Sequence, residues 1–93
     1  MLFRSVLNGH DHLYERFRPQ DPDGFPDAAR GLRQFTVGTG GGILHTPASV
    51  SPNREVIRTG AFGVLRLTLL SDGYDWDFLP VSGAGDSGHG ACH

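Results

Sequence analysis

Residues 62–81 read FGVLRLTLLSDGYDWDFLPV, and this stretch decides the fold class. Both halves alternate apolar and polar residues with the period of two that is typical of a half-buried strand. The positions that share a face are Leu65, Leu67 and Leu69 in the first half and Tyr74, Trp76 and Phe78 in the second. Ser71-Asp72-Gly73 lies between the halves as a turn. The sequence therefore predicts a β-hairpin from 62–70 and 74–81.

Outward from the hairpin, shorter signals also favour strands. Residues 3–7 form a short, mainly apolar segment that stops at Asn8-Gly9, and residues 32–37 alternate again. The stretches 18–29 and 45–53 are expected to be loops, the first with a turn at Asp23-Gly24. The one expected piece of helix is a turn near 13–16. The chain alone is thus predicted to be mainly β, with no obvious cover for the apolar face of its sheet.

Composition limits the size of the fold and its partners. A chain of 93 residues forms one small domain, predicted as residues 1–81 followed by a flexible Gly/Ser-rich tail at 82–93. The net charge is −2, so neither nucleic-acid binding nor membrane binding is expected. All eight cationic residues are Arg, which excludes chemistry that requires a lysine. Cys92 is the single cysteine and cannot form an internal disulfide. No signal peptide is evident, which leaves the localisation open.

The residues that indicate chemistry are NGHDHLYERF at 8–17. On an extended segment, His10 and His12 would point to the same side, with Cα atoms about 6–7 Å apart. That spacing suits one imidazole for each of two metal ions about 3.5–4 Å apart. A backbone carbonyl or Glu15 could orient an imidazole, while Asp11 would point away. The alternative is that the two histidines are ordinary polar residues of a surface loop.

The same run closely resembles the last metal-binding block of the calcineurin-like metallophosphoesterases, especially their purple acid phosphatase-like branch. In that family a Gly-His-x-His block ends a core strand and Tyr-Glu-Arg commonly follows. Further likenesses are the glycine-rich turn after Phe35, FGVL at 62–65, the hairpin with DFLP at 77–80, and a tail with DSG at 86–88. Relatives with such a tail are often secreted. The resemblance implies that this chain supplies the C-terminal strands of a four-layer α/β/β/α sandwich.

The resemblance also implies a metal site and a reaction. His10 and His12 would each ligate one ion of a pair of divalent or trivalent metals, with iron, zinc and manganese as candidates. The reaction would be hydrolysis of a phosphate mono- or diester by a metal-activated hydroxide. The family's other ligands, among them a bridging aspartate, have no counterpart in this chain.

This chain alone is therefore expected to bind metal weakly and to be inactive, because two neutral imidazoles cannot hold two cations. Its partners would be the phosphoester substrate and the missing N-terminal half or a complementing chain. The alternatives are a β-rich binding or assembly module without catalysis, or half of a complemented site.

Other motifs have a structural and a functional interpretation. Residues 38–42 are expected to form a strand-ending turn near the site rather than a phosphate loop, because the chain has no Lys. The Gly-x-Gly-x-x-Gly at 83–88 has no helix after it and is set aside. Arg16 and Arg18 could meet a substrate phosphate, although an ion pair within the fold is favoured for Arg16. The remaining candidates are a cluster of His45, His89, Cys92 and His93, interpreted as incidental, and the aromatic stripe of the hairpin, interpreted as core.

Overall fold

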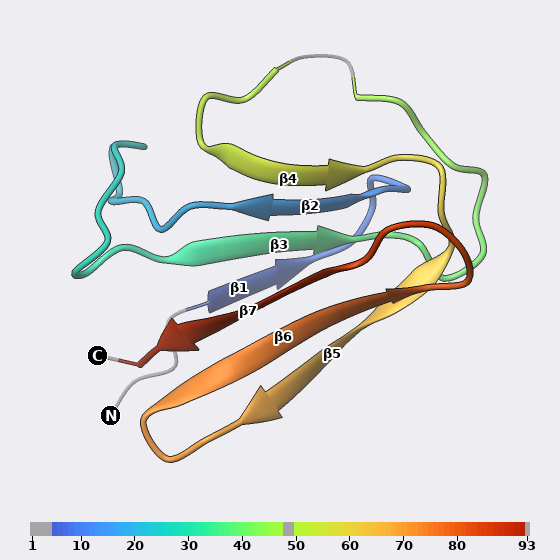
Figure 1. The fold of residues 1–93 in the computed structure, drawn as a ribbon. Helices are drawn as coiled ribbons and strands as arrows, with labels where there is room; N and C mark the ends of the chain where they lie inside the picture. Colours follow the sequence, from blue (N-terminus) through green and yellow to red (C-terminus); the bar gives the residue numbers. More distant parts are fainter. Residues whose placement is uncertain (1–4, 48–49, 93) are drawn as a thin grey trace.

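A computed structural model describes residues 5–47 and 50–92, and these form seven β-strands (Figure 1). The strands are β1 (Ser5–Asn8), β2 (Tyr14–Phe17), β3 (Arg33–Val37), β4 (Arg54–Arg58), β5 (Gly63–Leu69), β6 (Gly73–Pro80) and β7 (Asp86–Ala91). The described residues contain no helix, and therefore none that is long and apolar enough to cross a membrane. The fold is all-β, as the alternating hairpin predicts for the chain alone.

The strands make two sheets. The first is mixed, in the order β1-β3-β2-β4, with β1 and β3 parallel and the other pairs antiparallel. The second is antiparallel, in the order β5-β6-β7. Because β1 and β3 run in parallel, their carboxyl ends lie at the same end of the first sheet, which is on the right in Figure 1.

The core lies between the two sheets. Tyr14 and Phe35 come from the first sheet and pack against aromatic residues of β6. The aromatic cluster consists of Tyr14, Phe35, Tyr74, Trp76 and Phe78, with Leu65 and Leu67 of β5 packed against it. Each sheet thus covers the apolar face of the other, which corrects the expectation that nothing in the chain covers that face. The stripe Tyr74, Trp76 and Phe78 is core, as predicted.

The predicted hairpin is confirmed as β5 and β6, which pair from Gly63 with Pro80 to Leu69 with Tyr74. The strand predicted at 32–37 is confirmed as β3, and the one predicted at 3–7 corresponds to β1 from Ser5 onward. Gly24 has a φ of 86°, as the predicted turn at Asp23-Gly24 requires of its glycine.

Three segments differ from their predictions. The expected helical turn near 13–16 is instead strand β2, because Tyr14–Phe17 is hydrogen-bonded to β3 on one side and to β4 on the other. Strand β4 was not predicted at all. The tail, expected to be flexible, contains β7, which pairs with β6 over Asp86–Ala91. Two glycines of β7 fit against rings of β6, since a Cβ on Gly88 would meet Trp76 and one on Gly90 would meet Tyr74.

A candidate metal-binding loop

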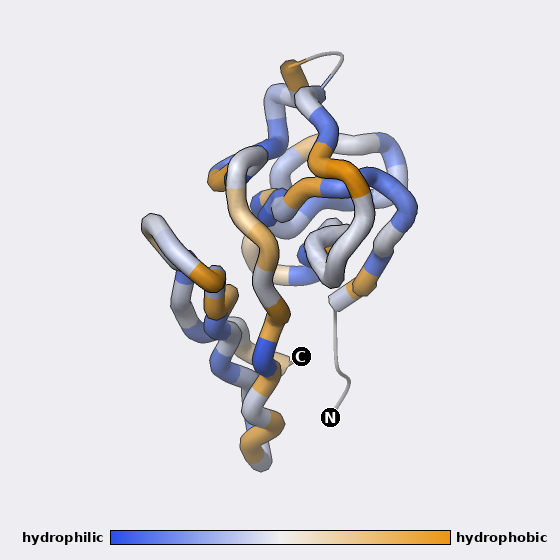
Figure 2. The backbone as a smooth tube through the Cα atoms, turned by 90° about the vertical axis from the view of Figure 1, so that its right-hand side faces the viewer, coloured by the Kyte–Doolittle hydropathy of each residue, from blue (hydrophilic) through white to orange (hydrophobic). Residues whose placement is uncertain are grey.

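Residues 9–13, called the histidine loop below, connect β1 to β2 at the end of the sandwich where β1 and β3 finish. Figure 2 views the molecule from this end. The loop is bent rather than extended, because the amide of Asp11 donates to the carbonyl of Gly9 at 3.0 Å and that of Leu13 donates to Asp11 at 2.8 Å. The expectation of an extended His-x-His segment is therefore wrong, although both histidines do lie in one loop, with His10 exposed and His12 half-buried.

His10 is the central residue of the first of these tight turns and has a φ of 76°. It is the one residue other than glycine with positive φ among those that the structure describes. A three-residue turn with this φ is rare and strained for a residue with a side chain, at a cost of roughly 1–3 kcal/mol. His10 is exposed, and this turn places it at the end of the sandwich where β1 finishes.

His12 is held by residues that follow β3. Its ring Nδ1 lies 2.6 Å from the carbonyl oxygen of Ile43. Its ring also stacks on that of His45, with centroids 4.2 Å apart and planes inclined by 10°. The backbone of His12 makes two further hydrogen bonds to His45, one through its amide to the ring Nδ1 at 3.1 Å and one through its carbonyl at 2.9 Å. A carbonyl thus orients the imidazole, whereas Glu15 instead lies 3.6 Å from Arg54.

The glycine-rich segment 38–42 makes room for the histidine loop. A Cβ on Gly38 would lie 2.0 Å from the carbonyl oxygen of Asp11, and one on Gly42 would lie 2.6 Å from Cε1 of His12. A Cβ on Gly40 would meet nothing within 4 Å. The segment is the strand-ending turn next to the candidate site that the sequence predicts.

His45 is the residue of this site that sequence reasoning missed. Its 33-residue separation from His12 gives no local signal that the two rings stack. The alternative cluster of His45, His89 and Cys92 does not form, because His45 contacts His12 while Nδ1 of His89 lies 2.8 Å from Asp75. His93, the fourth candidate, lies outside the described residues.

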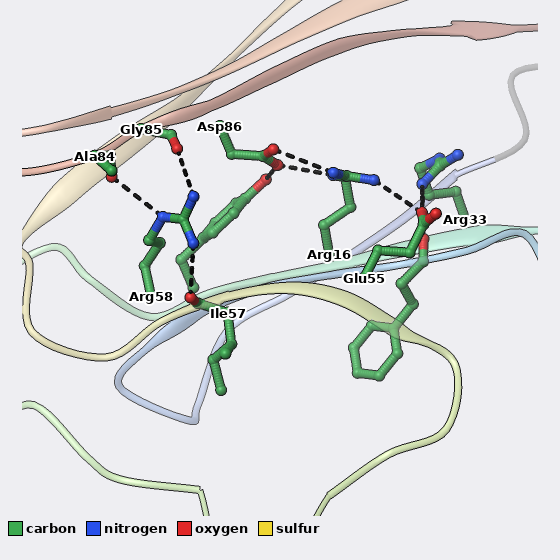
Figure 3. Close-up of polar contacts among 10 residues, drawn as sticks. Arg16, Arg33, Glu55, Ile57, Arg58, Ala84, Gly85 and Asp86 are labelled. Atoms are coloured by element: carbon green, nitrogen blue, oxygen red, sulfur yellow. Dashed lines mark hydrogen bonds and ion pairs between the residues drawn. The ribbon is translucent and has the colours of Figure 1, made fainter.

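Arg16 connects the two sheets and is not available to a substrate (Figure 3). Its guanidinium bonds Asp86 of β7 and Glu55 of β4, each at 2.8 Å, which confirms the predicted ion pair within the fold. Burial alone would raise the pKa of Asp86, but hydrogen bonds from Arg16 and Tyr14 outweigh it, and the pKa lies below its usual value. Burial and the bond to Asp86 raise the pKa of the Tyr14 hydroxyl.

A groove of about 550 Å³ adjoins the histidine loop. It runs between edge strands β1 and β5 of the two sheets, and its lining includes Leu7 and Gly9 on one side and Leu65 and Leu67 on the other. Leu7 is 52% exposed, which is high for a leucine facing the space between two sheets. The sandwich is therefore open along this side.

The ligand set that the described residues offer is incomplete for a binuclear centre. Within 5–47 and 50–92, no three residues among His, Cys, Asp and Glu are grouped so that they could hold a metal ion. His12 on its own fits the role of a ligand, because the contact of Nδ1 with a carbonyl leaves Nε2 for a metal. A bridging carboxylate would have to come from elsewhere.

Comparisons with models of known families, with curated proteins and with solved structures found no match for this chain. The resemblance to metallophosphoesterases therefore depends on the motif residues of the sequence alone.

Proposed function

We propose that this chain supplies the C-terminal part of a binuclear metallophosphoesterase, in which His10 and His12 each donate one imidazole nitrogen to a different metal ion. The observation that carries the proposal is the strained backbone of His10. Strain of this kind costs stability and is typically retained where function requires the geometry. Here it occurs at a candidate ligand, in an exposed loop, at the end of the sandwich where parallel strands β1 and β3 finish.

The open side of the sandwich supports the same proposal. The edge strands β1 and β5 both border the groove beside the histidine loop, so further strands could extend both sheets there. An extended pair of sheets covered by helices would give the four-layer α/β/β/α architecture of the resembling family. Strands added beside β1 would also bring residues to the histidine loop, where the bridging carboxylate and other anionic ligands are needed.

In this function the chain's own residues would bind the metal ions and orient the imidazoles, whereas the ions would activate the nucleophilic water. A bound pair of ions would supply a hydroxide nucleophile near neutral pH and would stabilise the charge that develops on the phosphoryl oxygens. The contact with Ile43 would orient His12 with its Nε2 toward the metal, and the tight turn at His10 would fix the backbone that carries the other imidazole. In the reaction that such ions would catalyse, the oxygen of water would become bonded to phosphorus, the bond from phosphorus to the ester oxygen would break, and the released alcohol would take up the proton that the water loses. Iron, zinc and manganese are the candidate ions, and phosphate mono- and diesters are the candidate substrates.

The test uses the native gene product carrying single substitutions. We expect His10→Ala and His12→Ala each to lower bound metal and hydrolysis of nitrophenyl phosphate mono- or diesters by more than about 100-fold, because each removes a ligand. His89→Ala is the matched control, because it removes an exposed imidazole of β7 that lies in a different sheet. Unchanged metal content and turnover in His10→Ala would overturn the proposal.

Residues 1–93 on their own give a second test. The purified chain is expected to bind Zn²⁺ or Mn²⁺ weakly and to hydrolyse neither ester, because it lacks anionic ligands. Turnover by this chain that disappears in His10→Ala would show that the two imidazoles suffice. The apolar groove favours assembly as the alternative function, in which a second chain completes the site or the module only binds a partner. Activity that appears only on mixing with such a chain would identify complementation.

A further inference from the structure

The hydrogen bonds of the stacked pair fix the protonated nitrogen of each ring. The carbonyl oxygen of Ile43 can only accept, so Nδ1 of His12 carries a proton and its Nε2 carries the lone pair. The backbone amide of His12 can only donate, so Nδ1 of His45 carries the lone pair and its Nε2 carries the proton. The two stacked imidazoles therefore have opposite tautomers.

This geometry prevents His45 from sharing a metal ion with His12. The lone pairs of an imidazole lie in the plane of its ring, and the two planes are nearly parallel at 4.2 Å, so the lone pairs do not converge on one point. The lone pair of His45 is in addition already used by the amide of His12. His45 consequently acts on His12 and not as a third ligand beside it.

We infer that His45, together with Gly42 and the carbonyl of Ile43, positions His12 so that Nε2 is the nitrogen presented to the metal. The inference deepens the proposed function and rests on it for the identity of the ligand. His45 restrains the ring by stacking and restrains the backbone by two hydrogen bonds. Gly42 leaves the space that the ring occupies, because any Cβ there would lie 2.6 Å from Cε1.

The tautomers can be measured without metal or substrate. Long-range ¹H–¹⁵N NMR of the ¹⁵N-labelled, metal-free chain at about pH 8.5, above the ordinary imidazole range, distinguishes protonated from unprotonated ring nitrogens. We expect His12 as the Nδ1–H form and His45 as the Nε2–H form. The Nε2–H form for His12, or a mixture of both forms, would overturn the inference.

Two pairs of variants separate positioning from simple folding. We expect Gly42→Ala to displace the His12 ring and mix its tautomers, while Gly40→Ala, which meets nothing within 4 Å, leaves them unchanged. His45→Ala should have the effect of Gly42→Ala, and His45→Asn should restore the Nδ1–H form, since its amide oxygen can accept from the His12 amide. Equal spectra for His45→Ala and His45→Asn would contradict the inference. If Gly42→Ala fails to fold, the comparison of the two His45 variants still tests it.

The metal readout distinguishes a failure of this inference from a failure of the proposed function. In the native product, His45→Ala should weaken metal affinity by about 10–100-fold, and His45→Asn should recover most of it. The expected tautomers without any effect of His12→Ala on metal content would refute the proposed function and leave the positioning intact. If His12→Ala lowers the metal content and His45→Ala leaves metal affinity unchanged, the positioning role of His45 is refuted and the proposed function is not.

Discussion

The β5–β6 hairpin and the histidine loop are organised by different kinds of information. The hairpin alternates along its own sequence, and its inner face supplies Tyr74, Trp76 and Phe78 to the aromatic core, with Leu65 and Leu67 packed against it. Leu69, at the far end of the same face, is exposed. The loop takes its shape from Gly38, Gly42 and His45, which lie 29 or more residues after its start at Gly9. The comparison shows that burial in the hairpin stabilises the fold, whereas the strained backbone of the histidine loop lowers its stability and keeps the loop in one defined geometry.

Truncation of Trp76 should have the largest effect on the free energy of unfolding, because Trp76 belongs to the aromatic core. Trp76 is 4% exposed, and the guanidiniums of Arg16 and Arg33 lie over its ring. We expect Trp76→Ala to cost about 3–5 kcal/mol in the free energy of unfolding, measured by urea denaturation. Arg66→Ala breaks an exposed ion pair of the same hairpin and should cost less than about 1 kcal/mol. Similar losses in the two variants would contradict the account of the core.

The Asp86 carboxylate should make the joint between the sheets sensitive to acid. Its pKa is lowered in the folded chain, so the carboxylate form is favoured by folding. The stability that it contributes is present above the ordinary Asp pKa of about 3.9 and is lost as the pH falls through the lowered value. We expect Asp86→Asn to lower the free energy of unfolding by about 2 kcal/mol at pH 7. The variant's unfolding midpoint should also fall less than that of the unsubstituted chain as the pH is lowered. An equal fall of the unfolding midpoint at low pH in both proteins would show that Asp86 is not the cause of the pH dependence.

Gly38→Ala tests the close approach that shapes the histidine loop. The new Cβ would lie 2.0 Å from a backbone oxygen of Asp11, so the backbone of the loop must move. We expect a loss of about 1–3 kcal/mol and shifted amide resonances in residues 9–13. Gly40→Ala serves as the control with open space around it. Two indistinguishable spectra would show that the loop does not depend on Gly38.

His10→Gly should give the smallest effect, and one of opposite sign. Glycine adopts a φ of 76° without strain, so we expect the free energy of unfolding to rise by about 1 kcal/mol. Asp11→Gly, at the neighbouring position, should give no such gain, because glycine there only increases the freedom of the unfolded chain. Loss of stability in His10→Gly would remove the argument that strain is kept for function.

The predictable part of the fold is the part whose burial pattern is local. The alternation of 62–81 predicts both hairpin strands and the part of the aromatic core that they supply, Tyr74, Trp76 and Phe78. Strand β2 is four residues long and is formed by pairing with β3 and β4. Its local sequence does not carry that information and is also compatible with a turn of helix. Strand β7 contains Gly88 and Gly90, which look flexible in the sequence but are required beside the rings of Trp76 and Tyr74.

The candidate site follows the same division. The motif 8–17 identifies His10 and His12 because both belong to one short segment. The bend of that segment, the role of the Ile43 carbonyl and the stacking of His45 all depend on contacts across the fold. His45 is a lone histidine in a loop, and nothing in the sequence near it indicates a contact with His12.

The most direct test of the central claim is the metal content of the native product. An antibody against residues 82–93 would isolate it, followed by intact-mass and elemental analysis of the same sample. The account predicts two metal ions for each copy of the chain, in a species or complex larger than 10.0 kDa. A stable 10.0 kDa product without bound metal would contradict it, and the module would then function by binding alone.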